Sequence, residues 1–159
     1  MILELQHIDP QRIAAIDSNG GELRYAEIGQ LAQHINSTVP MRSLCFLLVE
    51  NNVGGIAWTM SMLESRKLVP LILNAKTEET LYQQLVQTYQ PTYICAPDHI
   101  AVQGEVVDCQ YQYTLTKISD STPTIHSELS HLLPTSGSTG SPKLVRHKYN
   151  NIEAAGLNI

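Results

Sequence analysis

The sequence predicts an α/β fold built on a parallel sheet, and two observations support this. Continuous apolar runs at 43–49, 69–73 and 92–96 have the length and composition of strands that are covered on both faces. Segments with apolar residues at helical spacing, 53–63 and 77–89, separate these runs. Strands that alternate with helices are joined by right-handed crossovers. The pattern therefore favours a flavodoxin-like or Rossmann-like sheet with flanking helices.

The segment before the first apolar run predicts a hairpin and then a helix. Residues 14–17 and 22–25 flank a Ser-Asn-Gly-Gly sequence at 18–21, which is a strong turn signal. Apolar residues from Tyr25 to Ile35 then recur at helical spacing. This opening part is expected to precede the main sheet.

Prolines and asparagines mark where the central elements end. Asn51 and Asn52 follow the first strand as a turn, Pro91 ends the second helix, and Pro97 ends the third strand. Pro70 lacks an N–H donor, so we expect it near the start of its strand or at a sheet edge.

The pattern is weaker after Pro97. Residues 101–107 and 113–118 are candidate short strands, and 129–134 is a further apolar strand. We expect three parts: an N-terminal hairpin and helix (1–42), a βαβαβ parallel-sheet subdomain (43–133), and a phosphate-binding loop with the start of a next subdomain (134–159).

Composition and charge narrow the functional classes. The chain has 159 residues, 43% hydrophobic and 16% charged, as in globular proteins, and a net charge of −5. Residues 134–159 carry three basic side chains and one acidic one, whereas residues 1–133 carry seven basic and fourteen acidic ones. The negative net charge of the chain argues against a nucleic-acid-binding domain. We expect an anionic ligand at the basic segment, residues 134–159.

The cysteines and the N-terminus predict a cytoplasmic protein without a transmembrane segment. Cys45 and Cys95 lie in apolar runs, and the odd number of cysteines, with Cys109, favours buried reduced thiols over disulfides. Cys95 and His99 have the spacing of half a zinc site, but no second pair follows. The N-terminus lacks the basic region of a secretory signal, and the longest apolar run is too short to span a membrane.

Residues 135–143, Thr-Ser-Gly-Ser-Thr-Gly-Ser-Pro-Lys, form the most informative segment. Glycines allow backbone N–H groups to approach phosphate, hydroxyl groups donate hydrogen bonds to it, and a lysine adds positive charge. The preceding strand would place the loop at the carboxyl edge of the sheet, where α/β folds bind ligands. The predicted phosphate-binding residues are Thr135, Ser136, Gly137, Ser138, Thr139, Gly140 and Lys143, with Lys143 also the catalytic candidate and no direct metal ligand.

Other glycine-rich motifs do not match this spacing. A Walker A loop would require glycine at the position of Pro142 and Ser or Thr at that of Leu144. The glycines do not form Gly-x-Gly-x-x-Gly, and Gly137 and Gly140 are one residue too close for a nucleophile elbow. A flexible polar linker is the remaining alternative, and the apolar strand directly before the loop argues against it.

The loop resembles the signature of the AMP-forming adenylating enzymes, approximately Tyr-Thr-Ser-Gly-Thr-Thr-Gly-x-Pro-Lys-Gly-Val. These are the acyl-CoA synthetases, the adenylation domains of peptide synthetases and the luciferases. Four upstream segments resemble other stretches of the family in the same order: 22–28, 49–51, 69–71 and 77–81. The sequence departs from the family at Leu144, where a glycine is usual, at Tyr149, where a histidine is frequent, and at Pro134, where the loop usually begins with tyrosine.

The resemblance implies an ATP-dependent carboxylate ligase that uses Mg²⁺. A carboxylic acid would attack the α-phosphate of ATP, and the acyl group of the acyl-AMP would pass to coenzyme A or to a carrier-protein pantetheine. The loop would hold the β- and γ-phosphates, with Lys143 as the charge partner. The family's other site residues lie beyond the position of Ile159. We therefore expect an N-terminal fragment that is inactive without its C-terminal remainder.

Besides the ligase, a second function remains open at this point. The chain would then be a non-catalytic α/β binding or interaction module with a vestigial phosphate loop. The basic cluster of Lys143, Arg146, His147 and Lys148 is a thin footprint for nucleic acid on an acidic domain. Trp58 lies off the main apolar stripe of its helix, and we expect it to pack against a neighbour that this chain lacks rather than to line an acyl pocket.

Overall fold

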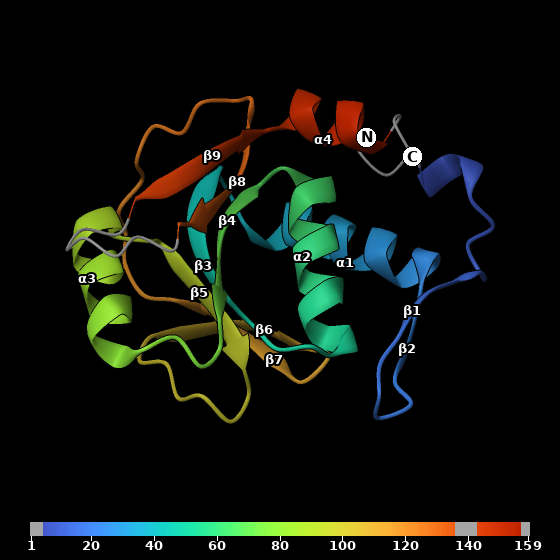
Figure 1. Ribbon diagram of the computed structural model, residues 1–159, viewed down its shortest axis with the longest axis horizontal. Coiled ribbons are helices and arrows are strands. Elements are labelled where there is room, and N and C mark those ends of the chain that lie inside the picture. Colours follow the sequence, from blue (N-terminus) through green and yellow to red (C-terminus); the bar gives the residue numbers. More distant parts are fainter. Residues whose placement is uncertain (1–4, 136–142, 157–159) are drawn as a thin grey trace.

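The computed structural model describes residues 5–135 and 143–156 (Figure 1). A 3₁₀-helix (Leu5–His7) and a hairpin of β1 (Ile13–Ile16) and β2 (Glu22–Arg24) come first. The helices are α1 (Tyr25–Thr38), α2 (Val53–Ser65), α3 (Glu79–Tyr89) and α4 (Tyr149–Gly156). The remaining strands are β3 (Ser43–Val49), β4 (Leu68–Asn74), β5 (Tyr93–Pro97), β6 (Glu105–Gln110), β7 (Tyr113–Lys117), β8 (Leu129–Pro134) and β9 (Leu144–Lys148).

The main sheet is parallel at its centre and antiparallel at both edges. In the described residues it has seven strands, in the order β6-β7-β5-β3-β4-β8-β9. The pairs of β3 with β5, β3 with β4, and β4 with β8 are parallel. The other pairs are antiparallel, and for β6 with β7 and β8 with β9 this follows from the short connections that join them directly. The predicted α/β class and its parallel core are confirmed, and the antiparallel edges are an addition to the prediction.

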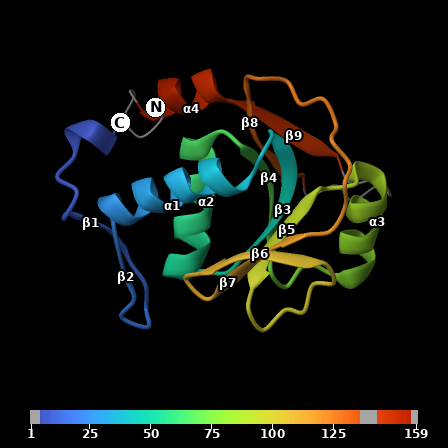
Figure 2. The same cartoon turned by 180° about the vertical axis from the view of Figure 1, so that it is seen from behind.

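The sheet separates two hydrophobic cores. Helices α1 and α2 cover one face and α3 covers the other (Figures 1 and 2). Strand β3 contributes to both cores, since Cys45 and Leu47 pack with α1 and α2, whereas Leu44, Phe46 and Leu48 pack on the α3 side. This alternation explains why the strand is a continuous apolar run.

The N-terminal hairpin has the turn that its sequence predicts, and the turn also supports α2. Gly20 has a φ of 81°, a conformation that glycine adopts without strain. The carboxylate of Asp17 accepts hydrogen bonds from the backbone N–H groups of Asn19 (2.9 Å), Gly21 (2.8 Å) and Val53 (3.0 Å). The bond from Val53 is the main reason that the pKa of Asp17 is lowered, and it caps the first turn of α2.

The hairpin of β6 and β7 packs against α2. Its two turn residues, Tyr111 and Gln112, have φ values of 54° and 61°, although neither is glycine. The Trp58 indole of α2 is fully buried and donates a hydrogen bond to the Gln110 carbonyl (3.1 Å). Trp58 therefore packs in this chain's own core, and not against a missing neighbour as the sequence analysis expects.

Pro70 is the third residue of β4, near the start of the strand as predicted. It pairs with Cys45 on one side. On the other side the register of β4 with β8 contains only Leu71 opposite Leu132. A residue without a donor is thus accommodated where the ladder is short.

The cysteines behave as the sequence predicts for reduced thiols. Cys45 and Cys95 are buried on neighbouring strands, and desolvation raises the pKa of both thiols. Cys109 is exposed, and all three are free. Cys45 and Cys95 therefore serve in packing, because a buried thiol with a raised pKa is unreactive.

Candidate functional site

The predicted phosphate loop connects β8 to β9, and its two ends are joined. The backbone N–H and the side-chain hydroxyl of Thr135 both donate to the carbonyl oxygen of Lys143, at 2.9 Å and 3.0 Å. Strand β8 lies parallel to β4, so the loop starts at the carboxyl edge of the parallel strands. This is the edge at which α/β sheets bind ligands.

The structure describes only the two ends of the predicted site. Ser136, Gly137, Ser138, Thr139 and Gly140 lie outside the described residues, so their binding role stays a prediction. The Lys143 side chain is exposed, and within the described part of the chain it forms no ion pair. Its ammonium is therefore available to an anion that approaches the loop.

Strand β9 follows the loop and carries most of the basic charge found at the end of the sequence. It pairs antiparallel with β8, with Pro134 opposite Leu144 and Leu132 opposite Arg146. The sequence analysis did not predict this strand. The segment Leu-Val-Arg-His-Lys has no alternation of apolar and polar residues that would indicate a strand.

Two histidines that are far apart in the sequence stack on each other across β8 and β9. The rings of His131 and His147 are parallel within 2°, with centroids 4.4 Å apart. Burial and the neighbouring His147 lower the pKa of His131 from 6.5 to about 4. Sequence spacing does not identify this pair, because the strand register brings the two rings together.

Acidification is expected to destabilise the β8–β9 pair. Between pH 6.5 and about 4 the unfolded chain binds a proton at His131 that the folded chain does not bind, so stability falls as the pH falls through this window. The residue is partly exposed and screened by solvent, which limits the loss to about 1 kcal/mol. Urea denaturation across this window tests the effect. A His131→Asn variant should show a flatter profile and the matched His126→Gln variant an unchanged one, and equal profiles for all three proteins would contradict the assignment.

Tyr149 fastens the end of β9 to the body of the domain. Its side chain is 1% exposed, and the Arg66 guanidinium lies over its ring, 4.3 Å from the centroid. The Tyr149 backbone N–H donates to the Glu128 carbonyl (3.1 Å), and the Arg42 guanidinium donates to the carbonyls of Arg66 and Leu129. Tyr149 therefore packs as a structural anchor.

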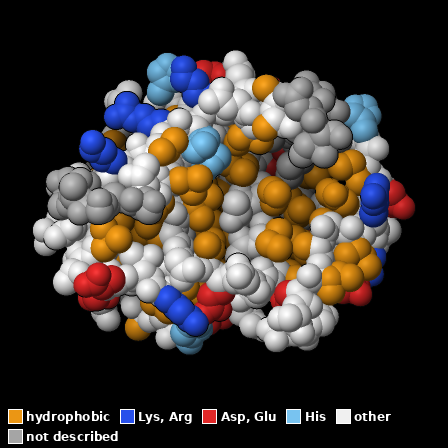
Figure 3. Space-filling model, in the orientation of Figure 1, with side chains coloured by type: hydrophobic (Ala, Val, Ile, Leu, Met, Phe, Trp, Pro, Cys, Tyr) orange, Lys and Arg blue, Asp and Glu red, His pale blue; other side chains and the backbone are white. Residues whose placement is uncertain are grey.

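A cleft lies beside α2, but its polar end is unsuited to phosphate. It has a volume of about 540 Å³, and Ile56, Met60 and Ile72 line it. Hydrophobic side chains gather in the middle of this face in Figure 3. The N-terminus of α2 lies at its rim, where Asp17 and Asn52 already accept the bonds of Val53 and Gly55. The Asp17 carboxylate would repel a further anion.

No metal centre or membrane span is found in residues 5–135 and 143–156. No group of three or more His, Cys, Asp and Glu side chains in these ranges is placed to hold a metal ion. None of the helices described there is long and apolar enough to cross a membrane.

Comparison with known proteins gives similarity in structure only. No known family profile matches the sequence, and no curated protein matches it. The N-terminal subdomain of Klebsiella oxytoca NpsA matches with a TM-score of 0.68 at 18% identity, over 98% of this chain and 42% of that one. O-succinylbenzoate coenzyme A synthetase (MenE) from Bacillus subtilis, in complex with AMP, matches with a TM-score of 0.68 at 16% identity, over 99% and 45%.

An artificially fused adenylation–PCP di-domain from Klebsiella oxytoca, NpsA-ThdA, also matches, with a TM-score of 0.68 at 17% identity, over 98% of this chain and 33% of that one. The chain thus spans less than half the length of these structures. The resemblance stated from the sequence is confirmed at the level of fold: the chain has the fold of the N-terminal subdomains of the adenylate-forming enzymes.

Proposed function

We propose that this chain is the phosphate-binding N-terminal part of an AMP-forming, ATP-dependent carboxylate ligase. The observation that carries the proposal is a Ser/Thr/Gly-rich segment, 135–143, that ends in lysine and whose described end residues, Thr135 and Lys143, lie at the carboxyl edge of the sheet. The AMP bound to the similar MenE structure supports the same class of ligand.

Lys143 and Thr135 would act on the phosphates. The exposed Lys143 ammonium would pair with the β- and γ-phosphates and stabilise the charge that develops on the leaving pyrophosphate. Thr135 would fix the backbone at Lys143 through its two hydrogen bonds, which limits the freedom of the lysine before ATP binds. Mg²⁺, when bound, would neutralise phosphate charge, and we assign no residue of the described ranges to it.

The second half of the proposed reaction transfers the acyl group to a thiol. The similar structures include a coenzyme A synthetase and an adenylation domain fused to a carrier domain. Coenzyme A and a carrier-protein pantetheine are therefore both retained as acceptors. We further propose a cytoplasmic location, in keeping with the three free thiols.

The test is ATP–pyrophosphate exchange by the full protein that contains this chain, with a panel of carboxylic acids. Lys143→Ala should lower the exchange rate about 10²- to 10³-fold, as expected for loss of a group that stabilises transition-state charge. The matched control is Lys67→Ala, since Lys67 directly precedes β4, at the opposite edge of the sheet, and its ammonium donates to the Pro40 carbonyl (3.0 Å) without an ion pair in the described part of the chain.

Two results would count against the proposal. A Lys143→Ala variant as active as the wild type would remove Lys143 from the site. A wild-type protein that exchanges no pyrophosphate with any acid would instead favour the non-catalytic binding module.

A further inference from the structure

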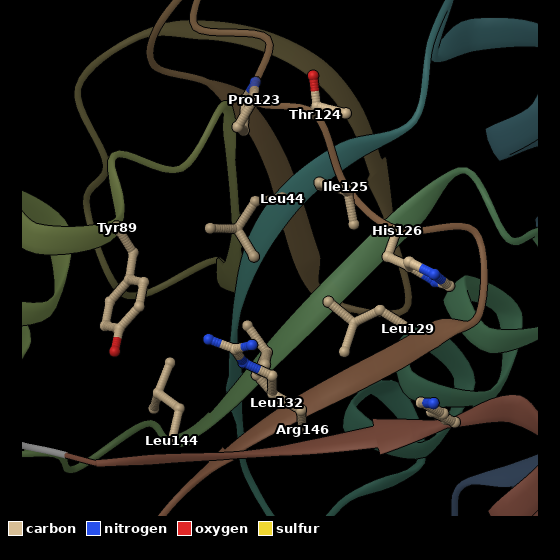
Figure 4. A pocket seen from close by; sticks show the side chains of 11 residues that line it. Leu44, Tyr89, Pro123, Thr124, Ile125, His126, Leu129, Leu132, Leu144 and Arg146 are labelled. Carbon is tan, nitrogen blue, oxygen red and sulfur yellow. The ribbon is translucent and has the colours of Figure 1, made fainter.

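An apolar cleft with a cationic rim lies on the α3 side of the sheet, beside β8 and β9 (Figure 4). Its volume is about 570 Å³, which falls within the range of about 300–1,000 Å³ typical of small-molecule sites. Side chains from β3, α3, β8, β9 and the segment before β8 converge on it. Its apolar lining includes Leu44, Tyr89, Ile125, Leu129, Leu132 and Leu144.

The rim of this cleft carries two uncompensated positive charges. Arg146 and Lys148 alternate with other residues on β9, so they share the face of the strand on which Leu144 lies. Neither has an ion-pair or hydrogen-bond partner within the described part of the chain, and no acidic side chain is among the lining residues. Figure 4 shows the Arg146 guanidinium turned toward the centre of the lining side chains.

This combination favours one kind of ligand. An inorganic anion would pair with Arg146 but would leave the leucine floor in contact with water. A neutral apolar molecule would cover the floor but would remove water from the cations without replacing its hydrogen bonds. A molecule with an anionic head and an apolar body satisfies both parts, because guanidinium binds carboxylate through paired hydrogen bonds and the body buries apolar surface.

We propose that the cleft binds an amphipathic organic anion, with a carboxylate head at Arg146 and Lys148 and an apolar body on Leu44, Leu132 and Leu144. Lys143 is not among the described residues that line the cleft, and none of the observations above uses the predicted phosphate loop. The inference therefore does not depend on the proposed function.

The experiment measures the binding of decanoate to the 159-residue chain by titration calorimetry, below the concentration at which decanoate forms micelles. Decan-1-ol, which has the same body and a neutral head, should bind at least about tenfold more weakly than decanoate. Arg146→Gln should weaken decanoate binding by about the same factor, because it removes a charge-assisted hydrogen-bond donor. Arg146 is exposed, so the variant is expected to fold normally.

The matched control is Lys117→Gln on β7, which removes a positive charge from the far side of the sheet and should leave decanoate binding unchanged. Equal binding of decanoate and decan-1-ol, or no effect of Arg146→Gln, would overturn the proposal by showing non-specific apolar adsorption. Sedimentation provides a second readout. Self-association of the chain that Arg146→Gln abolishes and decanoate does not displace would also overturn it, in favour of a second copy in the cleft.

Discussion

Trp58→Ala is expected to lower the free energy of unfolding by about 3–5 kcal/mol, the usual cost of truncating a large buried aromatic side chain. The Trp58 side chain is 0% exposed and packs in the core between the sheet, α1 and α2. Its loss leaves a cavity and also removes the hydrogen bond from the indole to the Gln110 carbonyl. That carbonyl belongs to β6, so the mutation also loosens the hairpin from α2.

Chemical denaturation followed by circular dichroism measures this loss, because Trp58 is the only tryptophan and its fluorescence disappears with it. Trp58→Phe should lose less, since it retains most of the apolar volume and loses the hydrogen bond. Met41, whose side chain is 50% exposed, provides a matched truncation outside the core, and Met41→Ala should change stability little. A Trp58→Ala protein as stable as Met41→Ala would contradict the packing role.

Gly54→Ala is expected to destabilise the fold by about 1–3 kcal/mol, although alanine is the better helix former. A Cβ at Gly54 would lie 2.3 Å from the Tyr111 carbonyl oxygen and 2.7 Å from Cε2 of Tyr113. The first of these atoms is backbone in a turn with left-handed φ values, and the second belongs to a fully buried ring. Neither has room to move, so α2 would have to shift away from the β6–β7 hairpin.

Gly29→Ala in α1 is the matched control. Within the described ranges, a Cβ at Gly29 would meet a Leu5 methyl carbon at 3.6 Å, an ordinary contact, and no other atom within 4 Å. The substitution should therefore stabilise the chain by about 0.5–1 kcal/mol through helix propensity. The midpoints of thermal or urea denaturation should shift in opposite directions from the wild type, downward for Gly54→Ala and upward for Gly29→Ala. A loss at Gly29 equal to that at Gly54 would show that backbone clash is not the cause.

The sequence predicts the central fold well because local patterns determine it. The run 43–49 is apolar throughout since both faces of β3 are covered, and α2 and α3 follow from helical periodicity. The edges of the sheet are less predictable. Tyr111 and Gln112 form a turn without the expected glycine, and β9 is recognisable only once its pairing with β8 is known.

The candidate site shows the same division between local and long-range information. Residue type and the apolar strand before it single out the segment 135–143 as a candidate, since hydroxyls, glycines and a lysine together suit an anion. Its position at the carboxyl edge, the stacking of His131 on His147 and the cleft beneath Arg146 depend on which strands become neighbours. Strand register fixes these contacts, and periodicity in one segment carries no information about it.

Strand β3 contributes side chains to both hydrophobic cores, and this affects how the domain unfolds. Because successive side chains of this strand are shared between the two cores, neither core can melt while the other remains intact. The centre of the molecule therefore behaves as one cooperative unit. Strand β6 and strand β9 each pair with a single neighbour at the outer edge, so partial opening begins there. Strand β9, which carries Arg146 and Lys148, thus belongs to the least cooperative part of the sheet, where a ligand bound to their side chains would stabilise the structure most.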